Sequence, residues 1–250
     1  MNVKHVSLAV DDHPEYKEFW HVVYPIWKMV GLQPHLAYTG ASDEVYEDLQ
    51  KTGGDFITRL EGGIKEAWAA SWGIFYGLNQ LPEDEVAITC GIDQLPLGRG
   101  MTDLLAGCGE GYAVLIDKKG INIPTAYHAA KVSEFQAVME FEDTWEEETR
   151  KLDEFPNPYL EYAARGRPKW GLDETWATLK LSGHDLIKPI SLAKFMARRL
   201  HTRGGILGRR EHFSEEALRD GWYYELICGR PYSVSKGEID AIIDIAFAPI

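Results

Sequence analysis

The first hundred residues alternate short apolar runs with longer segments in which apolar side chains recur every three or four positions. The apolar runs predict β-strands, and they are residues 3–12, 32–40, 54–60 and a run that begins at 85. The longer segments, residues 13–31 and 62–81, have the spacing of amphipathic helices. Strands that alternate with helices favour a largely parallel sheet with helices on its faces, and we therefore predict an α/β fold.

A proline and a polar connection modify the elements predicted from this pattern. Pro25 lies inside the first helical segment, and because proline lacks a backbone N–H we expect a kink or a break there. The polar connection at 41–53 is compatible with a short helix of its own.

Aspartates follow two of the predicted strands. Asp11 and Asp12 close the first strand, and Asp93 follows the strand that begins at Glu85. Since ligands of parallel sheets bind beyond the carboxyl ends of the strands, we expect these carboxylates to share one rim and to face a ligand. The alternative is that they are turn or helix-cap residues, positions at which aspartate is common.

Composition and charge narrow the class of protein. A chain of 250 residues that is 45% hydrophobic can bury a sizeable core, and we start from one domain. The formal net charge of −13 makes nucleic acid an unlikely partner without excluding it, because phosphate binding relies on Lys and Arg. The three cysteines lack metal-site spacing, and their odd number argues against a disulfide framework and for a reducing cytoplasm. Charge interrupts the apolar N-terminal run, so we expect a cytoplasmic protein without a signal peptide or transmembrane segment.

Five segments spaced along the chain carry a resemblance to a known family. They are SLAVDDHPEYKEFW, ITCGIDQLPL, PTAYHAAKVSEF, KWGLDETW and GRPYSVSKGEIDAII. Their order resembles that in small nucleotide-sugar-dependent glycosyltransferases of the GT-A fold. The resemblance implies one Rossmann-like domain over residues 1–250, with a mostly parallel mixed sheet, a nucleotide-binding half at 1–98 and an acceptor-side half at 99–250. It also implies a nucleotide-diphosphate sugar as donor and a saccharide or other hydroxyl compound as acceptor.

The resemblance assigns donor binding to the rim aspartates and their neighbours. In such enzymes an Asp-x-Asp motif after the fourth strand holds a divalent cation, and here Gly91 replaces the first aspartate while Asp93 matches the second. We expect Mn²⁺ or Mg²⁺ on Asp93, because a carboxylate that faces a diphosphate repels it unless a cation lies between them. The other expected donor contacts are Val10, Asp11, Asp12 and Arg203.

A metal-independent site is the open alternative. In the late segment YYELICGRPY, Glu225 and Ile227 stand where related enzymes have an acid and a histidine. Residues 188–210 contain basic side chains and no acidic one, and arginines such as Arg203 can neutralise a diphosphate instead. The same segment is equally compatible with a solvated basic surface.

The segment RPKWGLDETW indicates the acceptor side. The resemblance implies that Asp173 or Glu174 acts as the base on the attacking hydroxyl, while Trp170 offers a flat surface to a sugar ring. Alternatively, Asp173 is only the N-cap of a helix. Tyr127 and His128 are candidates for the sugar pocket, although a lone histidine is more often structural.

Two other functions compete with glycosyl transfer. One is sugar-1-phosphate nucleotidylyl transfer, but the glycine-rich signature with a basic residue expected after its first strand is absent from AVDDHPEY. The other is binding of a nucleotide sugar without catalysis, which the missing acid at Gly91 would permit. Glycosyl transfer explains the rim aspartates, the basic segment and the Trp-flanked carboxylates together.

Overall fold

Regular elements fill most of the chain that the computed structural model describes, which comprises residues 2–106, 110–116, 123–156, 169, 171–184, 188–191, 199–202 and 213–248. The strands are β1 (Val3–Val10), β2 (Gln33–Tyr38), β3 (Ile57–Arg59), β4 (Val86–Thr89), β5 (Gln94–Pro96), β6 (Ala113–Ile116), β7 (His128–Lys131), β8 (Lys188–Ser191), β9 (Arg199–His201) and β10 (Glu225–Ile227). The α-helices are α1 (Trp20–Met29), α2 (Asp43–Gln50), α3 (Ala67–Tyr76), α4 (Gly100–Ala106), α5 (Val132–Met139), α6 (Trp145–Glu154), α8 (Leu172–Leu181), α10 (Glu215–Arg219) and α11 (Tyr232–Ala246). Short 3-10 helices cover Lys17–Phe19, Gly54–Phe56 and Gly77–Gln80.

The main sheet has seven strands within the described ranges, in the order β3-β2-β1-β4-β7-β6-β8. Strands β3, β2, β1 and β4 run parallel to one another, as do β6 and β8. Strand β7 is antiparallel to both of its neighbours, β4 and β6. The mostly parallel mixed sheet predicted from the sequence is therefore confirmed, and the four strands expected in the first hundred residues are β1 to β4.

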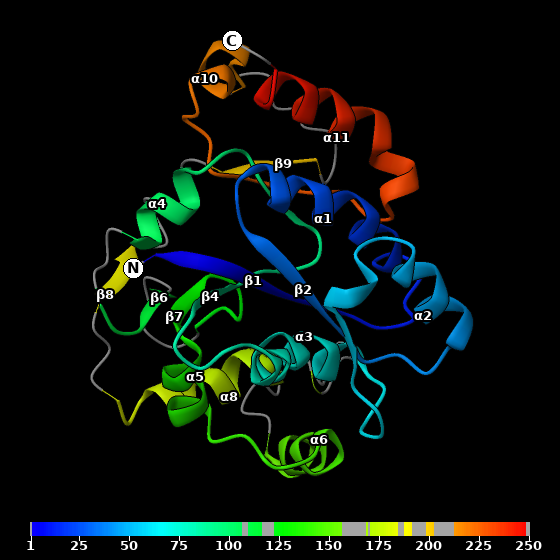
Figure 1. The fold of residues 1–250 in the computed structure, drawn as a ribbon, viewed down its shortest axis with the longest axis vertical. Helices are drawn as coiled ribbons and strands as arrows, with labels where there is room; N and C mark the ends of the chain where they lie inside the picture. The colour runs from blue at the N-terminus through cyan, green and yellow to red at the C-terminus, as the bar shows by residue number, and fades with distance from the viewer. Residues whose placement is uncertain are drawn as a thin grey trace.

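Helices cover both faces of this sheet (Figure 1). Helices α1 and α11 lie on one face, and α3, α5 and α8 lie on the other, with α6 outermost. The side chains of β1 divide between two cores, since Leu8 and Val10 pack with Trp27 of α1 whereas Ala9 packs with Trp72 of α3. Alternate residues of a strand point to opposite faces, so one strand supplies both layers.

A second sheet joins the late part of the chain to the end of β4. Its strand order is β5-β10-β9, with β5 antiparallel and β9 parallel to β10. Only residues 90–93 separate β4 from β5. Pairing of β5 with β10 therefore brings the segment after Ile227 to the carboxyl end of β4.

Two local predictions have different outcomes. The polar connection forms α2, and its N-cap Ser42 accepts a hydrogen bond from the Val45 N–H at 3.2 Å. No break occurs at Pro25, because α1 begins at Trp20 and continues through the proline to Met29.

Among the described helices, none is both long and apolar enough to cross a lipid bilayer.

Helix α3 packs at short range against β1 and β2 because the contacting residues are small. A Cβ atom added at Gly73 would lie 2.9 Å from Cγ2 of Thr39 and 3.3 Å from Cβ of Ala9. One added at Gly77, in the 3-10 helix that follows, would lie 3.0 Å from Cβ of Ala37. These gaps are too small for a methyl group, so the glycines set the distance between helix and sheet.

We expect Gly73→Ala to lower the free energy of unfolding by about 1 to 3 kcal/mol, because an extra methyl group in a packed core forces its neighbours apart. Thr39 is buried and its hydroxyl donates to the Val10 carbonyl at 3.3 Å, so it has little room to move. The control is Gly237→Ala in α11, where nothing lies within 4 Å and a gain of about 0.5 to 1 kcal/mol is expected. Urea unfolding compares the two; equal stabilities would contradict the packing constraint.

Candidate functional site

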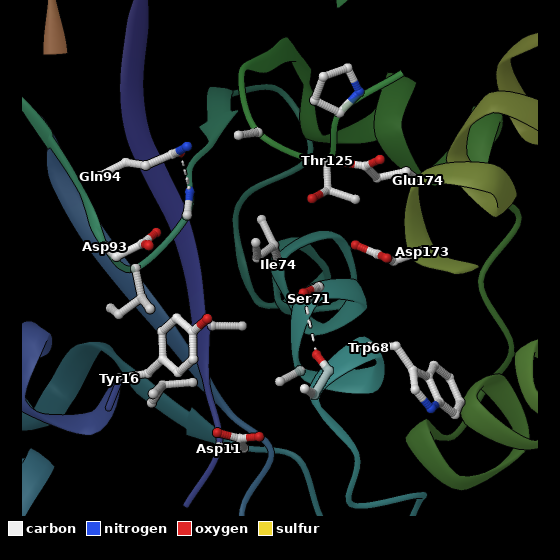
Figure 2. Close-up of a pocket in the computed structure, with 18 of the residues that line it drawn as sticks. Asp11, Tyr16, Trp68, Ser71, Ile74, Asp93, Gln94, Thr125, Asp173 and Glu174 are labelled. Atoms are coloured by element: carbon white, nitrogen blue, oxygen red, sulfur yellow. Dashed lines mark hydrogen bonds between the residues drawn. The ribbon is translucent and has the colours of Figure 1, made fainter. Parts of the chain in front are cut away.

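A cavity of about 510 Å³ opens at the carboxyl ends of β1 and β4. One wall is formed by the residues that follow these strands, and the opposite wall is formed by the start of α8 and the loop before β7. Figure 2 shows Asp11 and Asp93 on one side and Asp173 and Glu174 across from them. Helix α3 lies between the two walls and contributes Ser71.

The first wall contains most of the residues expected to contact a donor. Parallel pairing of β1 with β4 brings the two strand ends side by side, and the Cys90 N–H extends the ladder by donating to the Ser7 carbonyl at 3.0 Å. The expected donor residues that line the cavity are Val10, Asp11, Gly91 and Asp93. The shared rim predicted for Asp11 and Asp93 therefore exists.

Asp12 turns away from this cavity. Its carboxylate accepts hydrogen bonds from the Tyr38 hydroxyl, from the Ala41 N–H at 2.7 Å and from the Ser42 N–H at 3.2 Å. These contacts tie the end of β1 to the segment that precedes α2. They match the turn-residue alternative for Asp12, whereas its neighbour Asp11 faces the cavity.

The second sheet brings an arginine to Asp93. The Cys228 N–H donates to the backbone carbonyl of Asp93 at 2.8 Å, which fixes the chain after β10 beside the end of β4. Two residues further on, Nε of Arg230 lies 3.4 Å from Oδ2 of Asp93, and both side chains are largely buried. The guanidinium also lies 4.4 Å from the centre of the Tyr16 ring. Arg230, Asp93 and Tyr16 all line the cavity.

A second arginine reaches the cavity from β9. Arg199 pairs with Glu225, which lies opposite it on β10 and is fully buried. Burial lowers the pKa of Arg199 to about 10, so the guanidinium still carries its charge at neutral pH. Glu225, which stands where related enzymes have an acid, therefore has an arginine as its partner.

The opposite wall presents Asp173 and Glu174 at the start of α8. Gly171, with a φ of 75°, occupies the N-cap position, and the helix begins one residue later. Burial raises the pKa of Asp173 to about 7, and the neighbouring charge of Glu174 adds to the rise. Hydrogen bonds from backbone N–H groups at the helix start and from the Thr125 side chain limit it. Asp173 thus accepts amide hydrogen bonds of α8 and also faces the cavity.

The loop before β7 is hydrogen-bonded to β4. It places Tyr127 at the cavity and leaves His128 buried, although both are candidates for the sugar pocket. The Thr89 hydroxyl donates to the Thr125 carbonyl at 2.7 Å, and the Tyr127 N–H donates to the Thr89 carbonyl at 2.7 Å. Tyr127 adopts a φ of 65° and lines the cavity. His128 is fully buried behind it, where Nε2 donates to the Pro124 carbonyl and the Tyr112 hydroxyl contacts Nδ1.

The role of His128 is consequently structural. A carbonyl oxygen only accepts, so the bond to Pro124 assigns the proton to Nε2 and leaves Nδ1 to accept from Tyr112. Burial lowers the pKa of His128 to about 4, and the ring is neutral at physiological pH. This is the common structural role that a lone histidine has.

Some site residues were not assigned from the sequence, and others lie outside the described ranges. Trp68 lies on a helical apolar stripe and is buried in the core, and it also lines the cavity together with Ser71 and Ile74 of α3. Arg230 belongs to the GRPY segment, and no local sequence pattern indicates that this arginine reaches Asp93. Trp170 and Arg203 lie outside the part of the chain that the structure describes.

The described side chains at the first wall fit a divalent cation poorly. Mn²⁺ and Mg²⁺ usually take one or two carboxylates together with water and phosphate oxygens. Here Gly91 offers no side chain, Asp93 contacts Arg230, and Oδ1 of Asp11 accepts a hydrogen bond from the His13 N–H at 2.9 Å. Throughout the described ranges, no group of three or more histidine, cysteine or acidic side chains is arranged to hold a metal ion.

Comparison with known proteins identifies the fold. No protein-family model matches the sequence, and no curated protein matches it. The chain is structurally similar to an active-site mutant of LgtC, with a TM-score of 0.50 and 10% identity over 97% of this chain and 95% of that one. The glycosyltransferase GlyE of Streptococcus pneumoniae gives a TM-score of 0.48 and 13% identity over 99% of this chain and 61% of that one. The likeness to LgtC shows that this chain has a GT-A-like fold.

We expect Asp173→Asn to stabilise the folded protein at pH 8 by up to about 4 kcal/mol and to change its stability little near pH 4. The folded state binds the Asp173 proton more tightly than the unfolded chain does, so stability is lost as the pH rises from about 4 to about 7. Asparagine does not titrate and removes this loss. Urea unfolding across this pH range measures it, with Asp84→Asn on the exposed loop before β4 as control. A constant difference between wild type and Asp173→Asn at all pH values would refute the assignment.

Proposed function

We propose that this protein transfers a glycosyl group from a nucleotide-diphosphate sugar to an acceptor hydroxyl. The observation that carries the proposal is that Asp173, with a pKa of about 7, lies across one cavity from the rim formed by Asp11, Asp93 and Arg230. The GT-A-like fold is consistent with this reaction, because it is the fold of nucleotide-sugar transferases.

The first wall suits the donor. Ligands of parallel sheets bind beyond the carboxyl ends of the strands, and this wall follows β1 and β4 directly. Arg199 and Arg230 line it and supply the positive charge that a diphosphate requires. The sugar of such a donor then points toward α3 and the second wall.

The second wall suits the acceptor. As the acceptor oxygen attacks the anomeric carbon and the nucleoside diphosphate departs, the hydroxyl proton has to pass to a base. A carboxylate with a pKa near 7 accepts that proton more readily than an ordinary aspartate and is still ionised in about half of the molecules at neutral pH. We therefore assign the base to Asp173, and Glu174 on the same wall is the alternative for this role.

Replacement of each acid by its amide tests this assignment. Asp173→Asn should lower the turnover number for transfer by about 10² to 10⁴ while leaving donor affinity largely unchanged, because the amide cannot accept the proton. Glu174→Gln should have a much smaller effect on turnover. The measurement is product formation from a panel of nucleotide sugars and saccharide acceptors, followed by mass spectrometry. If Glu174→Gln abolishes transfer and Asp173→Asn does not, the two roles are exchanged.

The pH profile gives an independent test of the base. Transfer by the wild-type protein should fall as the pH drops through about 7, because protonation of Asp173 removes the acceptor for the hydroxyl proton. The residual activity of Asp173→Asn should lack this inflection. A wild-type profile that is flat between about pH 5 and pH 8 would argue against Asp173.

Other outcomes of the same assays identify the competing functions. Binding of a nucleotide sugar by the wild-type protein without turnover on any acceptor would indicate a binding protein. Formation of a nucleotide sugar and pyrophosphate from a nucleoside triphosphate and a sugar 1-phosphate would indicate nucleotidylyl transfer. Absence of binding to every nucleotide sugar would remove the proposal.

A further inference from the structure

The contact between Asp93 and Arg230 bears on how the cavity holds a diphosphate, an inference that rests on the proposed function. A carboxylate beside a diphosphate is repulsive at every separation unless a positive charge lies between them. The Arg230 guanidinium already lies against Asp93, with Nε 3.4 Å from Oδ2. Arg230 therefore supplies the positive charge that is needed to offset repulsion between Asp93 and a diphosphate.

The surroundings of Arg230 fix its guanidinium at the cavity. Asp93 contacts it through Nε, and the Tyr16 ring lies 4.4 Å away, so the group is held between a carboxylate and an aromatic ring. Asp93 is the ion-pair partner that the structure gives Arg230, and the charge of Glu15 also acts on this arginine, since it raises the pKa that burial lowers. Its guanidinium is thus oriented through Nε at the cavity that Arg230 lines.

The backbone around Arg230 is also well fixed. The Cys228 N–H donates to the Asp93 carbonyl at 2.8 Å, and the Gly229 N–H donates to the Thr202 hydroxyl. A Cβ atom added at Gly229 would lie 2.4 Å from Oγ of Ser235, so the chain passes through a closely packed position immediately before the arginine. The place of Arg230 is thus set by its backbone as well as by its side-chain contacts.

We propose that Arg230 binds the donor diphosphate in place of a divalent cation, and that Asp93 positions this arginine. A guanidinium is planar, stays charged at all physiological pH values and presents paired N–H groups that match two phosphate oxygens. Arg199 lies on the same wall and is paired with the buried Glu225 of β10, as Arg230 is with Asp93. We assign the principal phosphate contact to Arg230 because it is the arginine that lies beside Asp93 at the end of β4.

This assignment explains the replacement in the Asp-x-Asp pattern. A metal site at this strand end needs further oxygen ligands, and Gly91 supplies none from a side chain. A guanidinium needs only one carboxylate to orient it, and Asp93 is that carboxylate. The loss of the first aspartate and the presence of Arg230 are then two parts of the same arrangement.

Calorimetric binding of ADP, GDP, UDP and CDP to the full chain, in EDTA and in Mn²⁺, tests the proposal. At least one of these nucleotides should bind with the same Kd in both conditions. Arg230→Met should weaken that binding by about 10- to 100-fold, the usual range for loss of one charge-assisted phosphate contact. Arg230→Lys keeps the charge but loses the paired donors and should fall between the two. Arg150→Met, on the remote surface of α6, is the matched control and should bind as the wild type does.

The possible results separate this proposal from the function on which it rests. Binding that requires Mn²⁺ and is unaffected by Arg230→Met would overturn the role of Arg230 and leave glycosyl transfer in place. Failure of all four nucleotides to bind in either condition would overturn both. If Arg230→Met does not fold, the comparison of EDTA with Mn²⁺ on the wild-type protein still decides whether a divalent cation is required.

Discussion

The short distance between α3 and the sheet is the constraint on which the cavity depends. Because Gly73 and Gly77 have no side chains, the backbone at these two positions lies close to β1 and β2. A Cβ atom at Gly73 would contact Ala9, and one at Gly77 would contact Ala37. The same helix contributes Trp68, Ser71 and Ile74 to the cavity. The position of these three residues therefore depends on how closely α3 packs against the sheet. A larger residue at either glycine would displace the surface that lies between the two walls.

With the walls fixed, the environment of each aspartate decides its chemistry. Asp93 lies beside a guanidinium and an aromatic ring, and it is matched with a positive charge. Asp173 is buried next to Glu174 without a cationic partner among its described contacts, and its pKa rises to about 7. In the proposed reaction, two residues of the same type thus have different roles: Asp93 orients a phosphate-binding group and Asp173 takes up a proton.

The sequence predicts the early half of the fold well because the signals there are local. Apolar periodicity locates β1 to β4 and the helices between them, and parallel connection then places Asp11 and Asp93 on one rim. Asp12 shows the limit of this reasoning, since only the long-range contacts with Tyr38 and Ala41 distinguish it from Asp11. A turn residue and a ligand-binding residue have the same identity and nearly the same position in the sequence.

The later half of the site depends on contacts that no local pattern encodes. Trp68 has the spacing of a core residue, and its place on the cavity becomes evident only once α3 is laid across the sheet. Likewise, the GRPY segment indicates a missing histidine when it is read as a metal motif. That β5 pairs with β10, more than a hundred residues away in the sequence, is what brings Arg230 to Asp93.

The position of Asp93 at the junction of the two sheets explains why a buried strand ends in a single carboxylate. Its backbone carbonyl holds the chain after β10, and its side chain holds the arginine that this chain carries. One residue therefore couples the assembly of the second sheet to the charge of the cavity. A cation that is part of the chain is present in every folded molecule, whereas a metal ion has to be recruited from solution at a cost that depends on its concentration. In the proposed donor site, the pairing of β10 with β5 brings Arg230 to Asp93.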